Sequence, residues 1–126
     1  MASPEAALVA ALNANAGVSA LGPVFIAGGR QGTAYPYATL QRISTAGANH
    51  LDGASNLDWP RFQIDAWGVT AIAALNLAEA IRTAIDHQTI AGSSYPTFQD
   101  QRGPAPDEET RNFRVSQDYL VFHERT

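Results

Sequence analysis

Apolar and polar residues alternate most regularly over residues 61–67, where Phe62 and Ile64 lie on one side of the chain. A period of two residues predicts a strand with one buried face. Shorter apolar stretches predict two more strands, at residues 24–26 and about 37–44. These three segments are therefore expected to be strands.

Two other segments repeat their apolar residues at helical spacing. Residues 69–86 place apolar side chains at intervals of three and four positions, which predicts an amphipathic helix. Another helix is predicted to begin at Ser3-Pro4-Glu5, which offers a capping hydroxyl, a proline at the first helical position and a carboxylate near the positive dipole end. That helix should end by Gly17, because glycine readily takes the left-handed closing conformation.

Some apolar residues do not fit a single buried face. Ile72 and Leu75 fall on the polar side of the helix over residues 69–86. The last predicted strand, about residues 112–123, ends in a segment at 119–122 that is apolar on both faces. Both faces should therefore be covered there. A helix can supply one cover and a neighbouring subunit the other.

Two stretches lack a sustained period. Residues 45–58 are rich in Gly, Ala, Asn, Ser and Asp, and residues 98–111 contain two prolines and an acidic run. We expect both stretches to be long loops. The length of 126 residues predicts a single domain over residues 1–126.

Composition narrows the possible partners. Charged residues make up 16% of the chain, against about 25% in an ordinary soluble domain, so the surface must be mostly neutral polar. The net charge is -4, and all eight positive residues are arginines that form no basic cluster along the chain. Affinity for nucleic acid comes largely from neutralising phosphates, so we expect a poor DNA binder.

The absence of cysteine excludes disulfides, thiolate nucleophiles and cysteine-based zinc sites. No basic residue precedes Arg30, and no apolar run is long enough to cross a bilayer. We therefore expect neither a signal peptide nor a membrane span.

No group of residues has the pattern of a catalytic or metal site. His50 and Asp52 could supply two metal ligands, but no third lies at a supporting spacing. Ser55 lacks the closing glycine of a nucleophile elbow, and the acidic run at 107–109 lacks the alternation and glycine of a calcium loop. His123 is expected at a solvated strand end. The sequence thus predicts no enzyme, no metal and no cofactor.

The order of these signals resembles the tail-completion, or tail-terminator, proteins of long-tailed bacteriophages over nearly the whole chain. The most specific part is the block from Leu51 to Trp67, with Leu51-Asp52-Gly53, Ser55, Leu57-Asp58 and the strand Phe62-Gln63-Ile64-Asp65-Ala66-Trp67. Around it lie a short capped helix, a glycine turn, an alanine-rich helix and a terminal strand. The remaining parts of the resemblance are Tyr35-Pro36-Tyr37 and Arg114-Val115-Ser116.

The resemblance implies an α+β fold, with a small, mostly antiparallel sheet flanked by two main helices. It implies a structural protein of the virion, assembled in the host cytoplasm and located at the junction of tail and neck. Six copies would form a ring that caps the tube of the major tail-tube protein, stops tail elongation and docks the head-tail connector. The acidic net charge adds the expectation that DNA passes through this ring without being bound. The family has no known catalytic residues to carry over, and it also occurs in gene transfer agents.

This role gives the surplus apolar residues an interpretation as subunit contacts. For Ile72 and Leu75 the alternative is that both are ordinary aliphatic residues tolerated on the surface. A head-tail connector or adaptor, or a small hydrolase or ligand-binding domain, remains an alternative. We expect the carboxylates of the second long loop to face the lumen of the ring: Asp107, Glu108 and Glu109. The candidate subunit-interface residues are Ile72, Leu75, Leu51, Leu57, Leu120 and Phe122.

Overall fold

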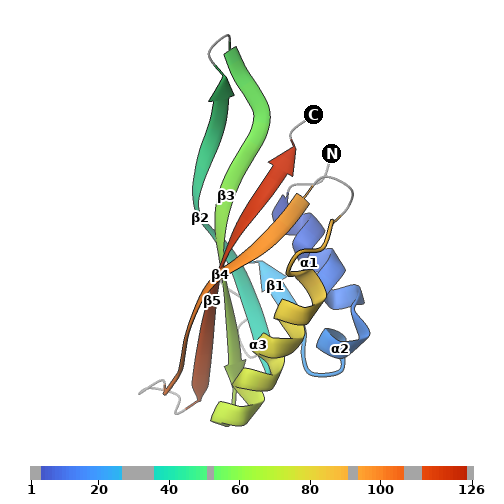
Figure 1. Cartoon of the computed structure of the whole chain (residues 1–126). Coiled ribbons are helices and arrows are strands. Elements are labelled where there is room, and N and C mark those ends of the chain that lie inside the picture. The colour runs from blue at the N-terminus through green and yellow to red at the C-terminus, as the bar shows by residue number, and fades with distance from the viewer. Residues whose placement is uncertain (1–3, 27–35, 51–52, 91–93, 107–111, 125–126) are drawn as a thin grey trace.

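The computed structural model describes residues 4–26, 36–50, 53–90, 94–106 and 112–124, and for residues 45–58 and 124 it describes the backbone alone. Within these ranges, five strands form one mixed sheet and three helices lie against one of its faces (Figure 1). The helices are α1 (Pro4–Ala14), α2 (Ala16–Ser19) and α3 (Ala71–Ile85). The strands are β1 (Val24–Ile26), β2 (Tyr37–His50), β3 (Gly53–Gly68), β4 (Ser94–Pro106) and β5 (Phe113–Glu124).

The strand order is β1-β2-β3-β5-β4. β1 runs parallel to β2, and the other three pairings are antiparallel. In register, Leu40 of β2 lies opposite Ile64 of β3, which in turn lies opposite Gln117 of β5. The expected small, mostly antiparallel sheet is confirmed in this coarse sense. Both main helices lie on the same side of it.

β3 passes directly into α3 at Gly68. A Cβ atom built at Gly68 would lie 2.6 Å from the backbone nitrogen of Ala74, so only glycine allows the helix to start this close to the strand. Thr70 then caps the helix, because its hydroxyl accepts a hydrogen bond from the Ala73 amide at 3.1 Å. The connection places α3 across the sheet that β3 has just left.

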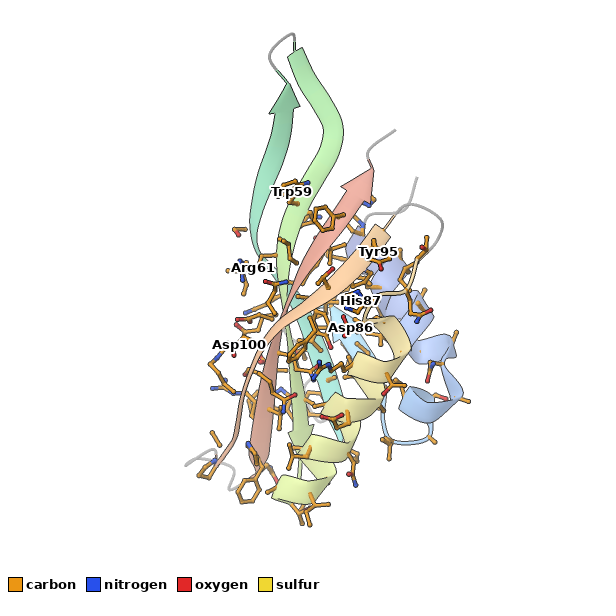
Figure 2. The ribbon with its side chains drawn as sticks, in the orientation of Figure 1. Trp59, Arg61, Asp86, His87, Tyr95 and Asp100 are labelled. Carbon is orange, nitrogen blue, oxygen red and sulfur yellow. The ribbon has the colours of Figure 1, made fainter. Side chains whose placement is uncertain are left out.

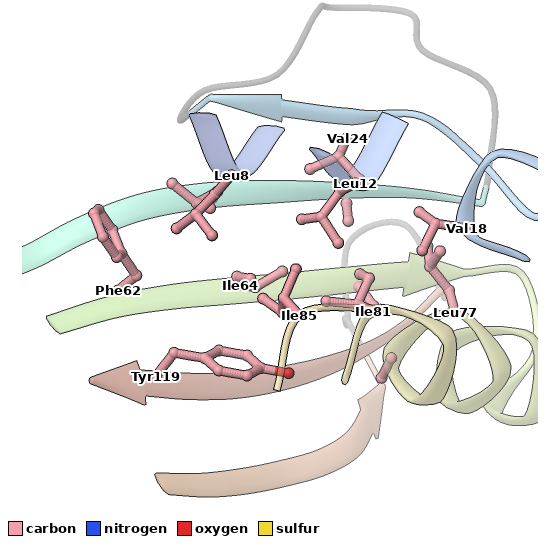
Figure 3. Packing of buried hydrophobic residues seen from close by; sticks show 14 of the residues in the cluster. Leu8, Leu12, Val18, Val24, Phe62, Ile64, Leu77, Ile81, Ile85 and Tyr119 are labelled. Atoms are coloured by element: carbon pink, nitrogen blue, oxygen red, sulfur yellow. The ribbon is translucent and has the colours of Figure 1, made fainter. Parts of the chain in front are cut away.

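The core lies between the sheet and the helices, on what we call the covered face (Figure 3). Phe62 and Ile64 of β3 are at most 1% exposed, and so are Leu77 and Ile81 of α3. Burying each of these side chains contributes about 1.5–3 kcal/mol. The same cluster includes, from the other elements, Leu8, Leu12, Val18, Val24, Ala38, Leu40, Val115, Tyr119 and Val121.

One buried amide organises the polar groups of this core. Gln117 is 1% exposed and donates to the Ala78 carbonyl at 3.1 Å and to Gln101 Oε1 at 2.9 Å. Its own oxygen accepts from the Tyr119 hydroxyl at 2.9 Å. Burial raises the pKa of Tyr119, which keeps the hydroxyl protonated and able to donate.

The predicted loop at residues 45–58 is wrong for the backbone the structure describes. Residues 45–50 continue β2 and residues 53–58 begin β3, with Ala46 opposite Trp59 and Asn49 opposite Ala54. Backbone hydrogen bonds between the paired strands form whatever the side chains are, so an irregular apolar pattern does not prevent a strand. This hairpin runs past the end of the remaining strands (Figure 1).

The predicted loop at 98–111 is also wrong as far as residue 106. β4 occupies the edge of the sheet, where proline costs no ladder hydrogen bond, and it therefore tolerates Pro96, Pro104 and Pro106. A register shift between Arg102 and Ala105 accommodates Gly103, whose φ is 97°. Residues 107–111 lie outside the described part of the chain.

Candidate interaction surface

The face of the sheet opposite the helices has no covering element among the described residues (Figure 2). Because side chains alternate along a strand, the neighbours of the buried core residues point to this open face. From β3 it receives Trp59, Arg61, Gln63, Asp65 and Trp67, and from β5 it receives Arg114, Ser116, Asp118, Leu120 and Phe122.

The charged side chains at the centre of the open face form ion pairs and hydrogen bonds within the same chain. Arg102 of β4 contacts both oxygens of Asp118, at 2.8 and 3.2 Å, and one oxygen of Asp100 at 3.1 Å. The hydrogen bond to Asp118 raises the pKa of the Arg102 guanidinium. Gln63 donates to the two oxygens of Asp65 at 2.9 and 3.2 Å. The charged side chains of this region therefore have hydrogen-bond partners within the same chain.

One end of the open face carries exposed aromatic rings beside an unpaired cation. Trp59 and Phe122 meet edge to face with ring centroids 5.1 Å apart, yet they remain 40% and 37% exposed. Arg61 lies next to them, opposite Leu120, and forms no ion pair with any residue that the structure describes. We call Trp59, Arg61, Leu120 and Phe122 the Trp59 patch.

The opposite end of the face is also aromatic, but its groups contact one another. Tyr37 stacks on Trp67 with centroids 6.3 Å apart, and Phe25 lies 6.5 Å from Tyr37. Arg114 sits over the Trp67 ring at 5.4 Å. The rings are only partly exposed, so this end offers less unsatisfied surface than the Trp59 patch.

The candidate contact residues on α3 separate into two environments. Ile72 is 69% exposed, and Val69 just before the helix is 60% exposed. Leu75 is partly buried and packs against the core, so it is not the surface residue that the helical pattern indicated. Glu79 is exposed two turns after Ile72 and forms no ion pair with the described residues.

The other candidate interface residues differ in exposure, and some are not described by the structure. Leu120 is partly buried and Phe122 is exposed, both on the open face. Leu51 and the acidic run at 107–109 lie outside the described residues, as does the side chain of Leu57. The sequence reading missed Trp59 and Arg61, although the alternation along residues 61–67 assigns Arg61 to the polar side.

A serine and a histidine meet inside the protein. Ser94 Oγ lies 2.8 Å from His123 Nδ1, and the two residues are 1% and 7% exposed. The expected solvated position of His123 is wrong, because residue 123 shares the covered face with Val121. The buried hydroxyl is out of reach of a substrate, so the pair holds β4 to β5 and has no catalytic geometry.

The end of α3 is fastened to β4 by Asp86. Its Oδ1 accepts from the Phe98 amide at 3.0 Å, and Arg82 lies 3.6 Å from Oδ2 while covering the Phe98 ring at 3.8 Å. His87 and Tyr95 are near neighbours, with rings 6.1 Å apart (Figure 2). These contacts position the helix on the sheet. None of them involves the outer side of the helix.

The described ranges contain neither a metal site nor a membrane-spanning helix. No cluster of three or more His, Cys, Asp or Glu residues there could hold a metal ion. No helix in those ranges has the length and hydropathy needed to cross a bilayer. The candidate sites in these ranges are therefore the exposed surfaces on the open face of the sheet and on α3.

Comparisons with known proteins point to one family. The family model described as "Tail completion protein gp17" matches residues 6–124. A solved chain from the "Virion of native gene transfer agent (GTA) particle" has a similar fold, with a TM-score of 0.81 and 21% sequence identity. The match covers 97% of this chain and 95% of that chain. No curated protein matches the sequence.

Proposed function

Because this chain belongs to the family of the tail completion protein gp17, we propose that six copies form a ring that caps the tail tube and stops its elongation. Family membership confirms the resemblance drawn from the sequence, and it makes the protein a structural component of the virion tail. The ring, the capping step and the docking of a head-tail connector on its far side are the proposal.

The observation that carries the proposal is the uncovered open face with its exposed Trp59 patch. A thin domain with one layer of helices and one sheet has two broad, chemically different surfaces (Figure 1). Copies that join through unlike surfaces are related head to tail, and such contacts form a ring when the rotation from one copy to the next closes. The similar chain comes from a gene transfer agent virion, which agrees with a role in a multi-subunit particle.

Deletion of the gene followed by electron microscopy of the particles tests the proposal. Tails of uncontrolled length beside full, unattached heads are expected, because nothing would then stop tube polymerisation. Normal tails with leaking heads would instead assign the protein to the head-tail connector. Averaged images of intact particles should show six copies at the boundary between tail and head, whereas a twelve-fold ring would also favour the connector.

The ring is proposed to conduct DNA without binding it. Six copies carry a formal charge of 6 × -4 = -24, and a lumen lined by Asp107, Glu108 and Glu109 would repel the phosphates. A labelled duplex titrated with the protein at low salt should show no change in fluorescence anisotropy. Micromolar binding that weakens steeply with added salt would reveal phosphate contacts and contradict this part of the proposal.

A further inference from the structure

We propose that the Trp59 patch of one subunit docks on the outer side of α3 of the next copy, with Arg61 facing Glu79. The outer side of α3 is defined here by Val69, Ile72 and Glu79. This inference rests on the proposed ring and names the two surfaces that build it.

The Trp59 patch has the composition of a binding surface. Aromatic residues and arginine are enriched in the energetically dominant centres of interfaces, because they combine a large contact area with hydrogen bonding. Trp59 and Phe122 already hold each other in one geometry through their edge contact. They would therefore lose little side-chain freedom on docking.

The outer side of α3 offers the matching groups. Val69 and Ile72 expose aliphatic side chains, and no element within the described ranges covers them. Glu79 follows Ile72 by seven residues, which is about two helical turns, so both project from the same side of the helix roughly 10 Å apart. The aliphatic part of this surface can pack against the rings of the Trp59 patch. Its carboxylate, on Glu79, can then pair with the guanidinium of Arg61.

Charge pairing within the chain singles out the same two residues. Glu5 pairs with Arg42, Arg82 with Asp86, and Arg102 with both Asp100 and Asp118. Asp65 accepts from Gln63, and Arg114 lies over Trp67. Among the charged side chains that the structure describes, these contacts leave Arg61 and Glu79 without an ion pair, side-chain hydrogen bond or ring contact, and their charges are opposite.

The fold prevents Arg61 and Glu79 from meeting within one chain. Arg61 projects from the open face of the sheet, and Glu79 projects from the far side of the helix layer that packs on the other face. Only a second copy can bring them together. The contact joins unlike surfaces, so each subunit keeps one of each kind for its next neighbour, as a closed ring requires.

The absence of cysteine from the chain makes a cross-linking test specific. Two tagged forms, Arg61→Cys and Glu79→Cys, are co-expressed in cells that produce particles, and the purified particles are treated with a short bis-maleimide. That reagent is needed because an arginine-glutamate pair separates the backbones beyond the span of a disulfide. Cross-linked dimers are expected only between the two forms. Particles carrying Arg114→Cys with Glu79→Cys are the matched control and should give none.

Two outcomes would overturn the proposal. Particles that contain both forms without any cross-link would show that these surfaces do not meet. Dimers formed by Arg61→Cys alone would show that two Trp59 patches face each other, which is a two-fold contact. A ladder of oligomers from a chain carrying both substitutions would extend the supporting result to the whole ring.

Charge reversal supplies an independent measurement. Arg61→Glu and Glu79→Arg should each lower the yield of complete particles roughly tenfold or more, because like charges across an interface cost several kcal/mol. The chain with both substitutions should regain most of that yield, whereas Arg114→Glu with Glu79→Arg should not. Unchanged melting temperatures would exclude misfolding. A double variant as poor as the worse single variant would contradict the pairing.

These results are separable from the test of the proposed function. If deletion gives tails of uncontrolled length but the cysteine pair gives no cross-linked dimer, the protein caps the tail through other surfaces. If cross-links form but deletion leaves tail length normal, the subunits assemble as inferred and the capping role is wrong.

Discussion

The covered and open faces of β3 are formed by side chains that alternate along one strand, yet they have opposite surroundings. Phe62 and Ile64 are buried under the helices, whereas Trp59 stays 40% exposed and Arg61 has no ion-pair partner among the side chains that the structure describes. One face therefore holds the monomer together and the other remains available for neighbours. Substitutions on the two faces should differ in kind, affecting folding in one case and assembly in the other.

The largest expected effect is on the covered face. Phe62→Ala should lower the free energy of unfolding by about 3–5 kcal/mol, because it empties a fully buried site. Trp59→Ala should cost less than Phe62→Ala, because 40% of the Trp59 surface is already exposed to solvent, while impairing assembly. Urea denaturation of the two purified variants measures the difference. Equal losses would show that the two faces contribute alike to folding.

The next largest loss of stability is expected at the buried amide of Gln117, in the core under the helices. Gln117→Ala leaves the Ala78 carbonyl and the Tyr119 hydroxyl without their partner, which should cost about 2 kcal/mol of unfolding free energy. Gln41→Ala, at an exposed position on β2, is the matched control and should change stability by less than about 0.5 kcal/mol. Thermal melting followed by circular dichroism compares them. A neutral Gln117→Ala would mean that water replaces the lost bonds.

The helix allows the same comparison between neighbouring positions. Leu75→Glu should destabilise the monomer by about 1 kcal/mol or more, because Leu75 packs partly against the core. Ile72→Glu should leave melting unchanged and reduce the yield of complete particles. If Ile72→Glu particles assemble normally, the outer side of α3 is not a contact surface.

Ion pairs on the open face should contribute less. Asp118→Asn weakens the contact with Arg102 and should cost no more than about 1 kcal/mol, because Arg102 is half exposed. The cost should shrink as salt is raised, since screening weakens exposed pairs. Denaturation at low and high salt provides the measurement, and a cost independent of salt would point to packing rather than charge.

The smallest effect concerns the pair between Glu5 and Arg42. Burial would raise the pKa of Glu5, but the hydrogen bond and charge of Arg42 outweigh it and hold the pKa below its usual 4.5. A lowered pKa in the folded state stabilises the protein above pH 4.5, and this contribution is lost as pH falls through the folded value. Arg42→Gln should therefore cost about 0.5 kcal/mol at pH 7 and less at pH 3. If the cost of Arg42→Gln grew as the pH was lowered, the pKa of Glu5 would be raised on folding and not lowered.

Local patterns in the sequence determined a large part of this structure. The alternation over residues 61–67 lies inside β3, and the helical spacing over residues 69–86 lies over α3. The segment at 24–26 is β1. These elements follow from periodicities that any backbone of that type imposes on its buried side. The block from Leu51 to Trp67 also carried the resemblance to the tail-completion family, which is confirmed.

Only the tertiary structure decided where the strands end and which surfaces remain open. Residues 45–50 and 53–58 are strands because each has a partner to bond, a property of the pair that neither segment shows alone. Leu75 and His123 are more buried than their local patterns indicate, because elements far away in the sequence cover them. Alternation says that a strand has two unlike faces. Which face the helices cover, and that Arg61 and Glu79 project from opposite sides of the domain, depends on how the whole chain packs.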